Sequence, residues 1–182
     1  MNTTTYLAET SVPMIWLVLA VAGALIRTRH VTAPAEKLEI WQRWWAGAAL
    51  GGGSLWMTIS FFTVPGVMSE AIGFRQTPFE FEIGCANLCL AVLAFRAASA
   101  KASARERMTI GLGAGMFLWG ADLGHLFQFF FRGNHAPGNT GGVLLYDLLI
   151  PAVMIALAAA AQRRTADAGT SYFRPVLNQP RV

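Results

Sequence analysis

Long apolar runs separated by short polar connections dominate the pattern of the chain. Five runs approach the roughly 20 helical residues needed to cross a hydrocarbon core of ~30 Å, and they cover about residues 11–27, 42–64, 79–98, 108–131 and 142–162. None of them alternates between apolar and polar positions as the strands of a membrane barrel do. The pattern predicts an all-α, polytopic transmembrane helix bundle with five spans in residues 1–164, followed by a polar tail at residues 165–182.

Composition supports a membrane protein. Of the 182 residues, 54% are hydrophobic and only 13% are charged, whereas a soluble domain has about 25% charged residues. The net charge is +4, but the basic residues lie between apolar runs and form no single block. We therefore expect the lipid bilayer as a partner and no nucleic acid. The N-terminal stretch MNTTTYLAE lacks the basic region of a secretory signal, so we interpret the first run as a retained helix.

The basic residues in the connections predict the orientation of the bundle. Two connections and the tail are rich in Lys and Arg, whereas the other two connections hold only Arg75 and Arg132. Because cytoplasmic loops carry the excess of basic residues, the N-terminus is expected outside and the tail inside. The residues that carry this prediction are Arg27, Arg29, Lys37 and Arg43, then Arg96, Lys101, Arg105 and Arg107, and finally Arg163, Arg164, Arg174 and Arg181. The tail alone is expected to be disordered.

Polar side chains inside the apolar runs gather in the outer half of this bundle. Three of them follow each other on the fourth run at a spacing of three residues, which places them on one slowly turning stripe. The third and fifth runs bring further polar groups to the same depth, and a Gly- and Asn-rich loop covers that end. The candidates for ligand binding or proton relay are Glu82, Asn87, Asp122, His125, Gln128 and Asp147, with Asn134, His135 and Asn139 in the loop.

An ionisable group at the centre of a membrane helix costs about 2.5 to 3.5 kcal/mol on insertion scales, so these groups are expected to face the bundle interior. His125 has two interpretations: a neutral imidazole bonded to Asp122, Asp147 or Asn87, or a proton relay, metal ligand or ligand contact. A mononuclear metal site of His125, His135 and Asp147 is one version of the second. No haem is expected, and no nucleotide motif is present.

Local patterns add expectations about packing. Glycines on both faces of the fourth run predict that this helix is central, and the stretch GAALGGGS, residues 47–54, predicts close packing of the second. Thr77, Pro78 and Glu80 form a capping-box pattern. Glu82 is interpreted either as a site ligand or as the ion-pair partner of Arg75 or Arg132.

Three further expectations concern side chains at or inside the helices. Pro151 leaves the carbonyl of Asp147 without its helical donor, which predicts a kink. Cys85 and Cys89 are expected as buried thiols. Trp41, Trp44 and Trp45 are expected as an interfacial belt.

The stretches TPFEFEIGCANLCLAVL, GADLGH and GNHAPGNTGGVLLYDLLIP together resemble a family of small prokaryotic integral membrane proteins, known only as a domain of unknown function. The resemblance covers about residues 77–155 and implies a helical fold in the prokaryotic cytoplasmic (inner) membrane, with no known activity. The matching positions are Pro78, Phe79, Glu82, Asn87, Gly120, Gly124, His125, Gly133, Asn134, Ala136, Pro137, Asn139, Tyr146, Asp147 and Pro151.

Two functions are consistent with these features. The first is a buried polar site in the outer leaflet half, which binds a proton, a metal cation or a small neutral ligand, since acids outnumber basic groups there. The second is a non-catalytic accessory subunit of a larger membrane complex, or a homo-oligomer, in which the polar residues hold helices and loops together. No enzyme motif distinguishes between them.

Overall fold

The computed structural model describes residues 10–172 of the chain, and every regular element among them is helical. The elements are α2 (Met14–Thr28), α3 (Pro34–Trp44), η1 (Trp45–Gly52), α4 (Gly53–Thr63), α5 (Pro65–Ala71), α6 (Phe79–Ala98), α7 (Ala104–Arg132), α8 (Pro137–Thr140) and α9 (Gly142–Tyr172). The all-helical fold class predicted from the apolar pattern is confirmed for these residues.

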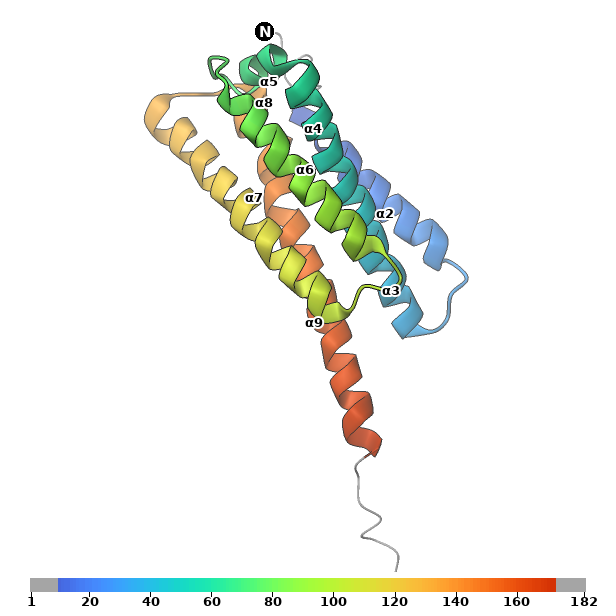
Figure 1. Ribbon diagram of the computed structural model, residues 1–182. Coiled ribbons are helices and arrows are strands. Elements are labelled where there is room, and N and C mark those ends of the chain that lie inside the picture. Colours follow the sequence, from blue (N-terminus) through green and yellow to red (C-terminus); the bar gives the residue numbers. More distant parts are fainter. Residues whose placement is uncertain (1–9, 173–182) are drawn as a thin grey trace, which may run out of the picture.

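Long helical segments lie side by side and alternate in direction (Figure 1). α3, η1 and α4 form one continuous segment between α2 and α6, and α7 and α9 complete the bundle. The short helices α5 and α8 cover one end. The connections after α2 and α6 lie at the opposite end, where α9 projects beyond the other helices. The basic connections therefore share one end of the bundle.

Two helical stretches among the described residues are long and apolar enough to cross a membrane: Phe79–Ala98 and Pro137–Ala166. The segment Pro34–Thr63 adds a third if it is counted together with Pro65–Ala71, from which it is separated by a bend of 114°. α2 is apolar but shorter. α7 has the length, but its polar and glycine residues dilute its apolar character. The structure thus supports two or three candidate spans.

The core is built from small side chains where the helices meet. Ala20, Ala46, Ala49, Ala94 and Ala158 are fully buried, and such residues let helix axes approach closely. η1 is a π-helix of 8 residues at the centre of this region, and π-helical turns are rare.

The predicted close packing of residues 47–54 is confirmed, because their glycines contact three different helices. A Cβ on Gly51 would meet Phe95 of α6, one on Gly52 would meet Trp16 of α2, and one on Gly53 would meet Tyr146 of α9.

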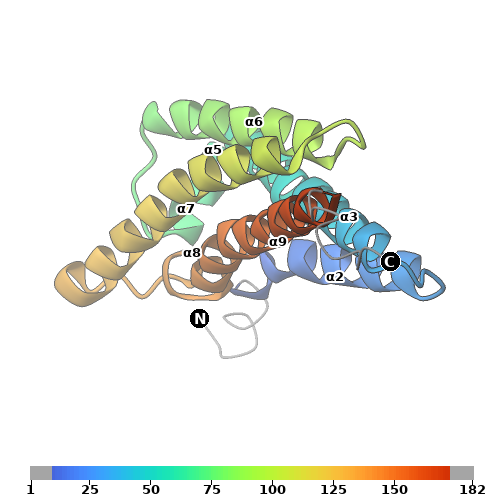
Figure 2. The same ribbon diagram turned by 90° about the horizontal axis from the view of Figure 1, so that it is seen from below.

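The prediction that the fourth run forms the central helix is wrong. α9 contacts α7, α8, α2, α3 and η1, whereas α7 packs mainly on α9, and the C-terminal half of α7 diverges from the bundle (Figure 2). Gly111 and Gly115 face α9, but Gly113, Gly120 and Gly124 have open space where a Cβ would stand. A face of small residues permits close packing but does not require it. The face of α7 that carries Gly113, Gly120 and Gly124 therefore packs against no other described helix.

α9 continues to Tyr172, ten residues beyond the predicted end of the fifth span at residue 162. Ala158 to Ala161 and the following Arg163 and Arg164 are strong helix formers, which favours continuation of the helix past residue 162. Residues 173–182 of the predicted tail lie outside the described residues, so the expectation of disorder there stays a prediction.

Candidate functional site

His125 and Asn139 join α7 to the loop that covers the end of the bundle where α5 and α8 lie. The Nδ1 atom of His125 lies 2.8 Å from Oδ1 of Asn139. The Nδ2 group of Asn139 donates to the backbone carbonyls of Asn134 at 2.9 Å and of His125 at 3.4 Å. Asn139 is fully buried. The structure therefore brings the loop candidate Asn139 to His125, whereas the partners predicted for the imidazole were Asp122, Asp147 or Asn87.

This geometry determines which ring nitrogen of His125 carries a proton. Because the amide nitrogen of Asn139 donates to two carbonyls, Oδ1 is an acceptor. An acceptor requires a donor opposite it, so Nδ1 of His125 bears hydrogen. In the neutral ring, Nε2 then holds the free lone pair. His125 is half-buried, and Nε2 is its only ring nitrogen open to a proton or a ligand.

Asn134, in the same loop, binds the turn that follows α5. Its Nδ2 group donates to the carbonyl of Ile72, 2.9 Å away, and its Oδ1 accepts from the backbone of Ala136. Gly73, with φ of +74°, passes so close that a Cβ there would lie 2.4 Å from Oδ1 of Asn134. The loop before α8 is thereby bound to the turn after α5.

Asp122 lies in a different environment, one turn further into α7. Its side chain lines an open groove of about 390 Å³ between α7 and α9, together with Trp119, Leu123, Leu126, Leu144, Leu145 and Leu148. Its Oδ1 atom is buried and has no hydrogen-bond partner among the described residues. A buried polar atom without a partner costs about 1 to 3 kcal/mol, so the groove contains an unmet acceptor.

Asp147 is buried on α9, with only 5% of its surface exposed. Its carboxyl group is close enough to that of Asp122 for an electrostatic interaction. The structure therefore brings two of the predicted acids within electrostatic range of each other: Asp122, which lines the groove, and Asp147, which is buried behind it. It shows no contact between Asp147 and His125, so the polar candidates form two separate groups, an acid pair and the His125–Asn139 hydrogen bond.

Several other candidates lie away from both groups. Glu82 is exposed on α6 and has no ion pair among the described residues, so neither of its predicted partners, Arg75 and Arg132, binds it. Asn87 is buried but donates to Ile83 of its own helix at 3.0 Å. Gln128 is half-buried, with no side-chain hydrogen bond within the part of the chain that the structure describes.

The predicted metal ligands are not brought together. His135 is exposed and stacks edge-on against Phe129, with 4.7 Å between the ring centroids. Within residues 10–172, no group of three or more His, Cys, Asp or Glu side chains is arranged to hold a metal ion. Cys85 and Cys89 are exposed thiols on α6, which corrects the prediction that they are buried packing residues.

The capping-box prediction at the start of α6 is confirmed. The carboxylate of Glu80 accepts from the backbone of Thr77 at 2.8 Å, and Oγ1 of Thr77 accepts from the backbone of Phe79 at 3.2 Å. A contact that the sequence did not predict adds to it, since Oγ of the buried Ser69 donates to the same carboxylate. Glu80 therefore has a structural role that also binds α5 to α6.

Sequence reasoning missed the contacts that two buried aromatic side chains, Tyr146 and Trp45, make with other helices. Tyr146 donates its hydroxyl to the carbonyl of Ala49 in η1 at 2.7 Å. Trp45 is buried and donates its indole N–H to Ile150 at 2.9 Å, which corrects its assignment to an interfacial belt. Trp119 donates to Leu148 at 3.3 Å. The indoles of Trp45 and Trp119 thus bind the carbonyls of Ile150 and Leu148, just before Pro151. The kink at Pro151 stays a prediction.

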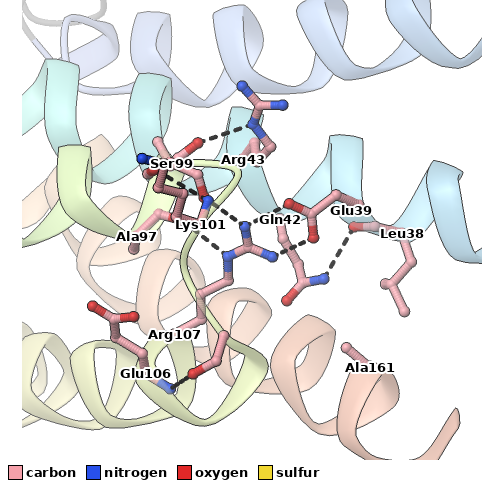
Figure 3. Close-up of polar contacts among 12 residues, drawn as sticks. Leu38, Glu39, Gln42, Arg43, Ala97, Ser99, Lys101, Glu106, Arg107 and Ala161 are labelled. Atoms are coloured by element: carbon pink, nitrogen blue, oxygen red, sulfur yellow. Dashed lines mark hydrogen bonds and ion pairs between the residues drawn. The ribbon is translucent and has the colours of Figure 1, made fainter. Parts of the chain in front are cut away.

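Arg107 was also missed, because it was counted only as an orientation signal. Its guanidinium is 2% exposed and is enclosed by Glu39, Ala97 and Ser99 (Figure 3). Nη1 and Nη2 both donate to the carboxylate of Glu39, the second at 2.7 Å. Nε donates to Ala97 at 2.9 Å and Nη2 also donates to Ser99 at 3.0 Å. This bidentate clamp holds the connection between α6 and α7 against α3.

The fold and these contacts define a class of protein: an all-helical bundle with apolar helices that suit a membrane, which contains an acid pair beside an open groove. Residues 10–167 match a family of unknown function (DUF6790), and the chain belongs to that family. No curated protein and no solved structure matches the chain.

Proposed function

We propose that this protein is an integral membrane protein of the prokaryotic cytoplasmic membrane, and that it binds a small ligand or a proton at Asp122 in the groove between α7 and α9. The observation that carries the proposal is the carboxyl group of Asp122, which lines that groove and whose buried Oδ1 atom has no hydrogen-bond partner among the described residues. Buried acids inside membrane helices are rare and belong to binding sites or proton pathways.

Five membrane crossings, with the N-terminus outside and the C-terminus inside, are part of the proposal. Large apolar side chains are exposed along α2, α6 and α7, including Val18, Val92 and Leu123, and exposed apolar surface of this extent suits a lipid environment. The connections rich in Lys and Arg share one end of the bundle. That end is then the cytoplasmic one.

The chemistry of the groove favours donors over anions. Asp122 lines the groove, Asp147 lies within electrostatic range of it, and no basic side chain among the described residues lines the groove. A proton, or a ligand that donates a hydrogen bond, satisfies the open carboxyl oxygen, whereas an anion is repelled by it. A metal cation is the weaker choice because three ligands are not brought together within the described residues.

One observation favours the second candidate function, an accessory subunit. The glycine face of α7 at Gly113, Gly120 and Gly124 has no neighbour in the described chain, and such faces are typical of contacts between membrane helices. In this alternative, α7 packs against another membrane subunit or a second copy of the chain, and Asp122 binds nothing.

Co-purification separates the two functions. We expect protein purified in mild detergent to carry a small molecule that mass spectrometry detects, and we expect Asp122→Asn to lose it while remaining folded. Glu82→Gln serves as the matched control, because Glu82 is an exposed acid on α6. If both variants carry the same molecules as the parent protein, and protein subunits co-purify instead, the accessory function is favoured.

A further inference from the structure

We propose that the ligand of the α7–α9 groove is an amphipathic amine that enters sideways from the bilayer and places its ammonium head against Asp122. This inference rests on the proposed function and names the class of ligand for the same site. It follows from three properties of the groove: its lining, its opening and its charge.

The lining requires an apolar body. Six of the seven lining residues are Leu or Trp, and Asp122 is the only polar one. The volume of about 390 Å³ lies within the range of small-molecule sites, which is about 300 to 1,000 Å³. Burying an alkyl body in such a groove stabilises the complex in proportion to the apolar area that leaves water.

The opening faces the lipid side of the bundle. Leu123 of α7 and Leu145 and Leu148 of α9 line the groove, yet they are 70%, 52% and 51% exposed. In the same region the outer half of α7 diverges from its neighbours (Figure 2). A ligand already dissolved in the outer leaflet therefore reaches Asp122 without crossing the loop locked by His125 and Asn139.

The charge of the groove selects the head of the ligand. Asp122 leaves one carboxyl oxygen without a donor, and the buried Asp147 lies within electrostatic range of it. A primary ammonium offers three donors and a positive charge, so it pairs with the Asp122 carboxylate at the wall of the groove. The indole N–H of Trp119 is bonded to the carbonyl of Leu148. A cation interacts with the face of an indole ring and not with its N–H, so the Trp119 ring remains able to stack on the ammonium group.

Other polar head groups of similar size match the environment of Asp122 less well. A carboxylate is repelled by both acids. An alcohol gives one donor and no charge, and a hydrocarbon leaves the carboxyl oxygen without a partner. The expected order of affinity is therefore the alkylamine first, then the alcohol, and the fatty acid last.

The test uses the full chain in phosphatidylcholine nanodiscs with dodecylamine, dodecan-1-ol and dodecanoate as probes. The fluorescence of Trp119, isolated by subtraction of the Trp119→Phe variant, reports occupancy of the groove. We expect dodecylamine to bind at least about tenfold more tightly than the other two probes, and Asp122→Asn to lose that preference. Glu82→Gln is the control for simple partitioning into lipid. Leu145→Trp, which fills the groove and keeps Asp122, should abolish the signal of all three probes.

The outcomes separate the inference of an amine ligand from the proposed function, which is ligand binding at Asp122. If dodecan-1-ol binds as tightly as dodecylamine and Asp122→Asn weakens both, the amine is wrong but Asp122 still binds a ligand. If all three probes bind with the same affinity, and neither Asp122→Asn nor Leu145→Trp changes that affinity, alkyl chains only cover the surface of the groove. Both proposals are then contradicted.

Discussion

At the scale of single residues, His125 has a defined role before any ligand is considered. Its Nδ1–H binds Oδ1 of Asn139, and the amide of Asn139 binds two carbonyls in turn. The imidazole is therefore a structural donor on one side and an open base on the other. The hydrogen-bonded imidazole predicted from the sequence is present, but its partner is Asn139 and none of the three predicted residues.

A pair of substitutions separates the two nitrogens. His125→Leu leaves the buried Oδ1 of Asn139 without a donor, and we expect a loss of about 1 to 3 kcal/mol in the free energy of unfolding. His125→Gln keeps a donor and should lose less. His135→Leu is the control, since His135 is exposed. Thermal unfolding in detergent measures the difference, and equal melting temperatures for His125→Leu and the parent would contradict the hydrogen bond.

Arg107 supports a second prediction at this scale. Removing one partner of a buried, hydrogen-bonded ion pair costs about 3 to 5 kcal/mol, and Glu39 is partly exposed. We therefore expect Arg107→Ala to lower the free energy of unfolding by about 3 kcal/mol, at the lower end of that range. The loss includes the donors to Ala97 and Ser99.

The same chain offers a matched control for Arg107. Arg96 pairs with Glu106 on the surface, with side chains that are 49% and 31% exposed. Exposed pairs contribute about 0 to 1 kcal/mol, so Arg96→Ala should change the unfolding transition little. Similar losses for the two arginine variants would mean that the buried clamp does not hold the connection between α6 and α7.

At the scale of elements, the apolar pattern predicts helices better than it predicts their partners. The run predicted at residues 79–98 coincides with α6, Phe79–Ala98, because the capping box fixes its start. The contacts of Tyr146 with Ala49 and of Trp45 with Ile150 could not be predicted in this way. Hydrophobicity indicates that an aromatic ring is buried, but not which distant carbonyl its polar atom meets.

The geometry of the α-helix explains why the predicted site divides. Residues three apart are rotated by about 60° relative to each other, so Asp122 faces the groove while His125 faces the loop of Asn139. Glu82 and Asn87 are five residues apart, which rotates them by about 140°. A helix that buries Asn87 therefore exposes Glu82, as α6 does. The sequence predicts the depth of these residues along their helices. The direction in which each side chain points depends on which helices are its neighbours, and the apolar pattern does not give that.

At the scale of the whole molecule, the basic connections and the polar loop lie at opposite ends. Lys101 lies in the connection between α6 and α7, and His135 lies in the loop before α8; both are exposed. They are about the length of α7 apart, and this helix of 29 residues measures roughly 44 Å at 1.5 Å per residue. That length exceeds the hydrocarbon core of ~30 Å, so the two residues serve as markers for the two faces of a membrane.

The orientation can be tested with single cysteines at these markers. In a background without the exposed Cys85 and Cys89, we expect a membrane-impermeant maleimide to label His135→Cys in intact cells. Lys101→Cys should be labelled only after the cells are permeabilised, because the proposed orientation places the basic connection in the cytoplasm. Labelling is preferable to an inserted reporter near Gly138, where a Cβ would already lie 2.8 Å from the carbonyl of Ala71. The reverse pattern would invert the bundle and turn the groove toward the inner leaflet, whereas labelling of both residues from outside would show that α7 does not cross the membrane.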